Sequence, residues 1–107
     1  MLPQKLVEEI THKIVRYYNP DKIIVFGSYA KGNNTQKSDI DILVLKDTDL
    51  PKYARGRELQ HFFLDSIIPV DFHFYTKEEF DEERNIPYSF AFSIDQTGKI
   101  IYEKKNL

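Results

Sequence analysis

The 107-residue sequence contains no cysteine and no tryptophan, and it has only four glycines. Without cysteine, the chain has no disulfide framework, no thiolate metal site and no thiol nucleophile. An excess of charge of one sign is missing too, because 15 Lys and Arg residues face 17 Asp and Glu residues, for a formal net charge of −2. Proteins that hold nucleic acid by its phosphates are usually strongly basic, so the composition argues against a nucleic-acid partner.

Long hydrophobic runs are also absent, so the sequence predicts neither a membrane-spanning helix nor a secretory signal. We therefore expect a cytoplasmic protein that does not contact a membrane. The apolar fraction of 41% and the aromatic fraction of 14% are typical of a packed domain rather than of a disordered chain. At this length, residues 1–107 are expected to form a single domain.

The spacing of apolar residues predicts helices that alternate with short strands. Helices are expected over residues 3–18, from Ser28, and over 51–68, 77–84 and 87–95, with Pro51 and Pro87 at the start of two of them. Strands are expected over residues 22–26, 39–45, 70–75 and 100–103. This order is typical of an α/β (α+β) fold in which helices flank a small mixed sheet.

Three aspartates lie within these strands. Asp39 and Asp41 are two residues apart, so both carboxylates project from the same face of a strand. Residues 70–75 alternate strictly, which puts Asp71 and His73 opposite the apolar face. If the two strands are neighbours, the three carboxylates converge and repel one another by several kcal/mol per pair at an effective dielectric constant of about 20. Bound Mg²⁺ would remove this repulsion, and the pattern therefore predicts a magnesium–nucleotide site.

A glycine–serine turn follows the strand over residues 22–26. Gly27 allows a ligand to approach the backbone closely, and Ser28 offers a hydroxyl and an amide at the start of a helix, where phosphate can bind. The turn is no P-loop, because Asn33 and Asn34 stand where that motif has Lys and Ser or Thr. A dinucleotide-binding motif is excluded as well, because the sequence contains no G-x-G.

Together these residues resemble the signature of the DNA polymerase β-like nucleotidyltransferase superfamily. The matching stretches are residues 26–32 (FGSYAKG) and 38–44 (SDIDILV), and Asp71 falls where that family has its third carboxylate. Over essentially the whole chain, the sequence looks most like the minimal nucleotidyltransferases, or MNT proteins. The resemblance implies the polymerase β-like fold.

The resemblance also implies roles for individual residues. In that family the glycine–serine pair binds the nucleotide triphosphate, which here would be the role of Gly27 and Ser28. The family's three aspartates bind two magnesium ions, with Mn²⁺ as the alternative, and the third helps to activate the attacking hydroxyl. These catalytic and metal-binding roles would fall to Asp39, Asp41 and Asp71.

One departure from the family pattern lies beside the glycine–serine pair. Many relatives have arginine where this chain has Tyr29 and Lys31. One positive charge is therefore missing next to the expected triphosphate, which bears on nucleotide affinity and substrate choice.

The activity implied by the resemblance is Mg²⁺-dependent transfer of a nucleoside monophosphate, AMP from ATP in the simplest case, to a hydroxyl. In the MNT family such a domain commonly pairs with an all-helical HEPN protein, as antitoxin with toxin, and some members adenylylate that partner. The alternative is a binding module that neutralises or scaffolds a helical partner with little or no catalysis. The full set of carboxylates favours the enzyme, since a scaffold has no need for mutually repelling charges.

Simpler interpretations remain for several polar residues. Asp39 and Asp41 could be exposed charges on an edge strand, and Asp71 could pair with a nearby lysine. A second D-x-D pair, Asp47 and Asp49, lies in a polar segment and is expected to be a solvated turn.

Other charged and aromatic residues are expected to lie at the surface. Arg55, Arg57 and the acidic segment 78–83 are expected on solvated faces, and His73 at the rim of the site. With eight Phe and seven Tyr, the chain has more aromatic residues than it can bury. An apolar surface for a helical partner or for a second copy of the chain is therefore expected.

Overall fold

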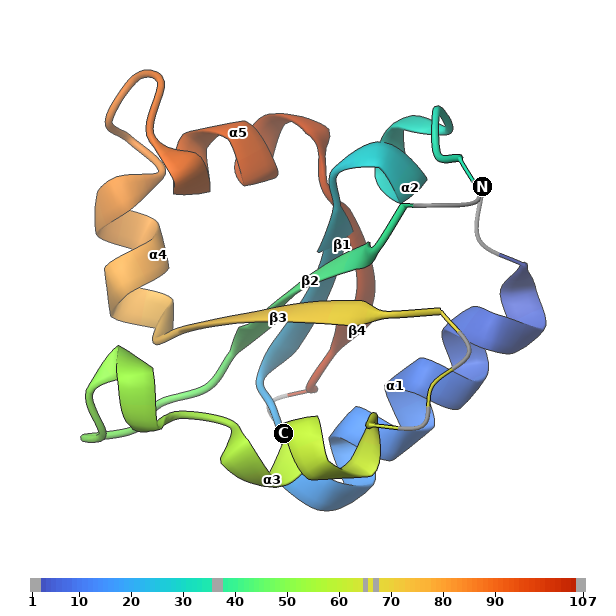
Figure 1. Ribbon diagram of the computed structural model, residues 1–107. Coiled ribbons are helices and arrows are strands. Elements are labelled where there is room, and N and C mark those ends of the chain that lie inside the picture. Colours follow the sequence, from blue (N-terminus) through green and yellow to red (C-terminus); the bar gives the residue numbers. More distant parts are fainter. Residues whose placement is uncertain (1–2, 36–37, 65, 67, 106–107) are drawn as a thin grey trace.

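The computed structural model describes residues 3–35, 38–64, 66 and 68–105. In this part of the chain, helices pack on both faces of a four-stranded sheet with the order β3-β2-β1-β4 (Figure 1). The strands are β1 (Lys22–Phe26), β2 (Ile40–Leu45), β3 (Val70–Tyr75) and β4 (Lys99–Glu103). The helices are α1 (Gln4–Tyr18), α2 (Ser28–Lys31), α3 (Arg57–Phe62), α4 (Lys77–Glu83) and α5 (Phe90–Thr97), with a 3₁₀ turn, η1 (Lys52–Ala54), before α3.

The sheet is mixed, as the sequence predicts. Strands β2 and β3 are parallel, whereas β1 is antiparallel to both β2 and β4. The α/β (α+β) fold class is therefore confirmed. Strand β2 begins one residue later than expected, so Asp39 lies just outside it.

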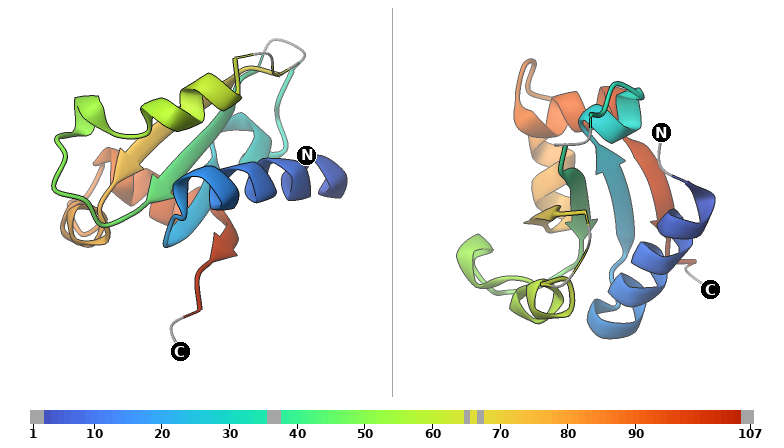
Figure 2. Two further views of the ribbon diagram at one scale, coloured as in Figure 1. Left: turned by 90° about the horizontal axis from the view of Figure 1, so that it is seen from below. Right: turned by 45° about the vertical axis from the view of Figure 1, so that its right-hand side comes forward.

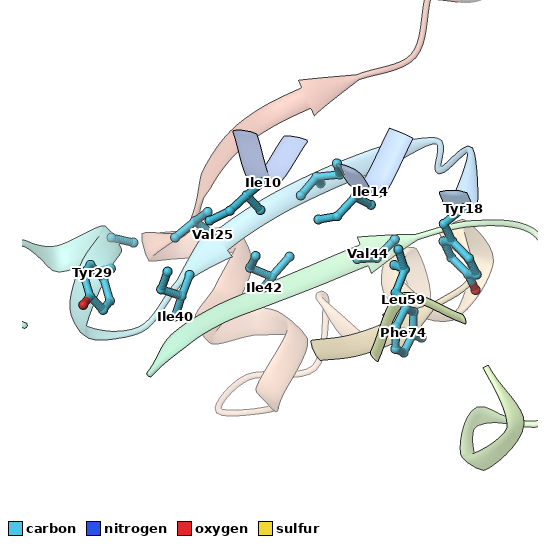
Figure 3. Packing of buried hydrophobic residues seen from close by; sticks show 12 residues of the cluster. Ile10, Ile14, Tyr18, Val25, Tyr29, Ile40, Ile42, Val44, Leu59 and Phe74 are labelled. Carbon is cyan, nitrogen blue, oxygen red and sulfur yellow. The ribbon is translucent and has the colours of Figure 1, made fainter. Parts of the chain in front are cut away.

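The two faces of the sheet are covered by different helices (Figure 2). Alternate residues of β2, Ile40, Ile42 and Val44, belong to a core cluster with residues of α1 and α3 (Figure 3). Leu43 and Leu45 point the other way, into a second cluster with residues of α4 and α5. The period of two in β-strands thus divides one strand between two cores.

The prediction of one continuous helix over residues 51–68 is wrong. Residues 65 and 67 of this range lie outside the described part of the chain. Only the turn η1 and the short helix α3 form, because Gly56 between them adopts a left-handed conformation with φ of 73°. A Cβ atom at Gly56 would lie 1.9 Å from the ring of Phe74. The ring of Phe74 therefore packs directly against the backbone of Gly56, in space that a side chain would fill.

The helix expected from Pro87 begins three residues later. Tyr88 has a φ of 67°, which is incompatible with a right-handed helix. The Ser89 hydroxyl instead accepts a hydrogen bond from the amide of Phe92 and caps α5. Among the described residues, no helix is long and apolar enough to cross a membrane.

Candidate active site

Two of the three aspartates face each other where β2 and β3 begin. In the parallel register, Asp41 is the partner of Asp71, and His73 follows on the same face of β3. The imidazole Nε2 of His73 lies 3.4 Å from Oδ2 of Asp71. One donor atom from each of Asp41, Asp71 and His73 lies within 4.8 Å of the others. Two carboxylates and one imidazole therefore converge on a space that a divalent cation could occupy.

The third aspartate lies outside this cluster of Asp41, Asp71 and His73. Asp39 precedes β2 and is exposed. It lies near enough for its negative charge to raise the pKa of Asp41, although this is the weakest of the causes that raise it. The structure thus brings Asp41 and Asp71 together and leaves Asp39 at the margin.

Gly27 leaves room for the carboxylate of Asp41. Phe26 is the register partner of Asp41, so the next residue, Gly27, passes directly over this side chain. A Cβ atom at Gly27 would lie 2.3 Å from Oδ2 of Asp41. Gly27 also has a φ of 74°, which side chains rarely tolerate. The carboxylate of Asp41 therefore fits at its observed position only because residue 27 has no side chain.

The residues after Gly27 differ in their surroundings. Ser28 begins α2 and is half-buried. Tyr29 is buried in the core with residues of α1 (Figure 3). Lys31 is exposed. Tyr29 thus contributes to the core instead of a positive charge, and Lys31 is the one positively charged residue of α2.

The electrostatics of the cluster show an uncompensated negative charge. Burial raises the pKa of Asp41 above its usual value, and the neighbouring carboxylate of Asp71 raises it further. The nearby His73 lowers it in part. Because the charge of Asp71 disfavours the ionised form of Asp41, a cation bound between the two carboxylates would offset this repulsion.

Aromatic side chains line the cluster on the side of α5. The His73 ring lies 5.4 Å from the ring of Phe26 and 5.0 Å from that of Phe90, between ring centroids. Phe90, at the start of α5, keeps 42% of its surface exposed. The cluster therefore lies next to an aromatic wall that remains partly open to solvent.

A carboxylate at the end of α4 holds the start of α5 in place. Glu83 accepts hydrogen bonds from the amide of Ala91, at 2.8 Å, and from the hydroxyl of Tyr75, at 3.1 Å. Burial, together with the charge of Glu83, raises the pKa of Tyr75 to about 12. Phe90 is thereby tied to β3, the strand that carries Asp71 and His73.

The sequence predicts Arg55 on a solvated face, and this prediction is wrong. Its side chain is 6% exposed and forms two hydrogen bonds with the carboxylate of Glu79, at 2.6 and 3.1 Å. It also donates to the carbonyl oxygens of Leu50 and Phe74. The Arg55 side chain turns inward because these four acceptors compensate for the loss of water.

The acidic segment over residues 78–83 is likewise only partly a solvated face. Glu79 pairs with Arg55 and completes a capping box with Thr76 at the start of α4. The hydrogen bonds from Arg55 lower the pKa of Glu79 to about 2. A threonine followed three residues later by glutamate is the one local signal that could have marked Glu79 in the sequence.

Two residues at the site were not assigned to it by sequence reasoning. The sequence predicts His73 on the correct face but at the rim, and it gives Phe90 no place in the site. The alternation of residues 70–75 indicates the face of His73, but not its distance from Asp71. Nothing local to Phe90 indicates that α5 would bring it next to β3.

Comparison with known proteins agrees with this geometry. Residues 7–95 match the model of a family described as a nucleotidyltransferase domain. The chain belongs to this family. It is 43% identical over 51 residues to MJ0604 and 44% identical over 55 residues to MJ0128, both named as candidate protein adenylyltransferases of Methanocaldococcus jannaschii. The matches cover 46% and 50% of this chain, and 51% and 55% of those relatives, so the chain spans about half the length of the curated relatives it matches.

Solved structures share the fold. A toxin–antitoxin crystallised with AMP-PNP superposes with a TM-score of 0.62 at 24% identity, over 92% of this chain and 74% of the other. A candidate nucleotidyltransferase from Sulfolobus solfataricus superposes with a TM-score of 0.64 at 20% identity, over 94% and 79%. The fold is that of the polymerase β-like nucleotidyltransferases.

Proposed function

We propose that the protein is a Mg²⁺-dependent nucleotidyltransferase that moves AMP from ATP to a hydroxyl group, and that the hydroxyl belongs to a partner protein. The observation that carries the proposal is the pair of carboxylates, Asp41 and Asp71, facing each other beside Gly27 in a nucleotidyltransferase domain. The choice of AMP, and of a protein as acceptor, follows the names of the curated relatives.

The residues present fit a divalent cation. Oxygens of Asp41 and Asp71 lie within 4.8 Å of each other, and burial together with the charge of Asp71 raises the pKa of Asp41. Asp41 and Asp71 would hold the metal, with Asp39 joining them at the margin of the cluster. When bound, magnesium supplies charge neutralisation for the phosphates and for the leaving pyrophosphate.

The protein's own groups would orient the reactants. Gly27 and Ser28 would hold the triphosphate, because the absence of a side chain at Gly27 leaves the backbone accessible beside Asp41. Asp71 would accept the proton of the attacking hydroxyl. The new bond joins this oxygen to the α-phosphorus, and the bond from the α-phosphorus to pyrophosphate breaks.

A substitution of Asp71 tests the proposed role of this carboxylate. Asp71→Asn preserves the shape but removes the proton acceptor, so we expect transfer of labelled AMP to fall by about a hundredfold or more. Binding of a fluorescent ATP analogue should survive, because Asp41 and the Gly27–Ser28 turn remain. Asp49→Asn, in the second D-x-D pair, is the matched control and should transfer at the wild-type rate. Equal transfer by Asp71→Asn and the wild type would contradict the proposal.

A binding module for a helical HEPN-type partner, or a homo-oligomer, is the second candidate. The observation that favours it is the exposure of large apolar residues: Leu64, Tyr53 and Tyr88 are 79%, 83% and 97% exposed. A variant with Asp39, Asp41 and Asp71 all changed to Asn separates the two functions. If this variant still neutralises a toxic partner, the protein acts by binding, whereas loss of neutralisation together with intact partner binding supports the enzyme.

A further inference from the structure

The cluster of Asp41, Asp71 and His73 presents a nitrogen atom where a purely magnesium-binding site would present oxygen. Of the described residues, these three have donor atoms within 4.8 Å of one another, and one of the three atoms belongs to an imidazole. The exposed Asp39 is not a member of this group. The donor set in the structure is therefore two carboxylates and one histidine rather than three carboxylates.

The His73 ring is held in place rather than free in solvent. It packs against the rings of Phe26 and Phe90, which also contact each other, and its side chain is only 32% exposed. Phe90 is itself fixed, because the amide of the next residue, Ala91, donates to the carboxylate of Glu83. An imidazole that is already oriented loses little conformational entropy when it binds a ligand.

The spacing of the three donors suits a six-coordinate cation. With bonds of about 2.1 Å, such an ion holds neighbouring ligand atoms about 3 Å apart and opposite ones about 4.2 Å apart. His73 Nε2 lies 3.4 Å from Asp71 Oδ2, so small side-chain rotations would bring both atoms into adjacent coordination positions. Imidazole nitrogen favours transition metals, whereas magnesium prefers oxygen.

We propose that His73 is a direct metal ligand and that it makes this site bind Mn²⁺ more tightly than Mg²⁺, the ion that the proposed function uses. The inference rests on the proposed function, because it requires a cation between Asp41 and Asp71. It goes further in naming a residue that lies outside the three aspartates and that sets which metal the site prefers. Phe90 then acts as a positioning residue that keeps the imidazole directed at the metal.

The rival explanation is that His73 only donates a hydrogen bond to Asp71. In that case the imidazole would orient the carboxylate without touching the metal. Loss of affinity in a His73 variant would be expected from either arrangement, so affinity alone does not decide between them. A signal that arises only from a directly bound nitrogen is needed.

Pulsed electron paramagnetic resonance of Mn²⁺ bound to the wild-type protein supplies that signal. We expect electron spin echo modulation from a coordinated ¹⁴N nucleus, and we expect ¹⁵N-histidine labelling to replace it with the ¹⁵N pattern. The modulation should vanish in His73→Gln and persist in His61→Gln, a control on the exposed face of α3. The labelling experiment needs no variant, so a folding defect in His73→Gln leaves the test intact.

Metal titrations provide the second measurement. In His73→Gln we expect the Kd for Mn²⁺ to rise about tenfold or more, and the Kd for Mg²⁺ to change less than about threefold. Mn²⁺ bound without nitrogen modulation would overturn the role of His73 and leave the proposed function standing. Absence of Mn²⁺ and Mg²⁺ binding in the wild type, with or without ATP, would instead overturn both.

Discussion

Two clusters of charged side chains lie at opposite ends of the parallel pair β2–β3. One cluster lowers the pKa of its carboxylate, whereas the other raises it. At the far end of β3, the carboxylate of Glu79 pairs with Arg55, and its pKa falls to about 2. At the start of the pair, Asp41 faces Asp71, and the pKa of Asp41 is raised. The first cluster is complete within the protein, whereas the second lacks a positive charge.

This difference indicates a structural role for the Arg55–Glu79 cluster and supports the proposed metal-binding role of Asp41 and Asp71. Arg55 has protein acceptors around its guanidinium group, so a ligand would add little there. Asp41 and Asp71 would both gain from a cation. A carboxylate whose pKa is raised and which lies beside partly exposed aromatic side chains is typical of a ligand-binding site. The following predictions test this comparison, from the largest expected effect to the smallest.

Removing the ion pair between Arg55 and Glu79 should have the largest effect on stability. Arg55→Met removes the charge-assisted hydrogen bonds to Glu79 and leaves the partly buried carbonyl oxygen of Leu50 and the buried one of Phe74 without this donor. We expect the free energy of unfolding to fall by about 3 kcal/mol at neutral pH. Arg57→Met, at an exposed position two residues away, should change it by no more than about 0.5 kcal/mol. Urea unfolding measures both.

The pH dependence of unfolding provides a check on Arg55→Met. The pKa of Glu79 is lowered on folding, so its contribution to stability is present above about pH 4.5 and is lost as the pH falls towards about 2. The difference between the wild type and Arg55→Met should therefore shrink over this interval. A difference that stays constant from pH 6 to pH 2.5 would contradict the assigned ion pair.

Substitution at Gly27 should damage the second cluster while costing less stability. Gly32→Ala forces a side chain into the left-handed helical conformation, at a cost of about 1–2 kcal/mol. Gly27→Ala forces one into a positive-φ conformation with a ψ of −151°, which is essentially restricted to glycine and costs about 1–3 kcal/mol. Only the Cβ at Gly27 would meet the carboxylate of Asp41, since nothing lies within 4 Å of the one at Gly32. We expect Mn²⁺ affinity, measured by calorimetry, to fall about tenfold in Gly27→Ala and to be retained in Gly32→Ala. Equal affinities would show that the contact with Asp41 is unimportant.

Removing one charge from the uncompensated cluster should give the smallest effect, and one of opposite sign. The pKa of Asp41 is raised on folding, so its ionisation lowers stability as the pH rises through the carboxyl range. Without metal at pH 7, Asp41→Asn should therefore be more stable than the wild type, by on the order of 1 kcal/mol.

Thermal unfolding in the presence of a chelator measures this gain. Asp49→Asn, which removes an exposed carboxylate, is the control and should leave stability unchanged. Added Mn²⁺ should raise the melting temperature of the wild type but not that of Asp41→Asn. A destabilised Asp41→Asn would mean that the carboxylate is already compensated by the protein.

The sequence alone determined which side chains share a face of each strand. Because side chains alternate along a strand and apolar ones fill the core, residues 39–45 and 70–75 predicted Asp41, Asp71 and His73 on the side away from Ile42 and Phe72. The structure agrees, with Ile42 and Phe72 in or against the core cluster that includes α1.

Tertiary structure alone decided the distances between these groups. Asp41 and Asp71 are 30 residues apart and become partners only through the parallel register of β2 and β3, which no local pattern specifies. Arg55 turned inward because Gly56 interrupts the expected helix where the ring of Phe74 packs against it. Phe90 reached His73 because Glu83 anchors the start of α5. Local propensities govern each element separately, whereas packing between elements far apart in the sequence decided which donor atoms meet.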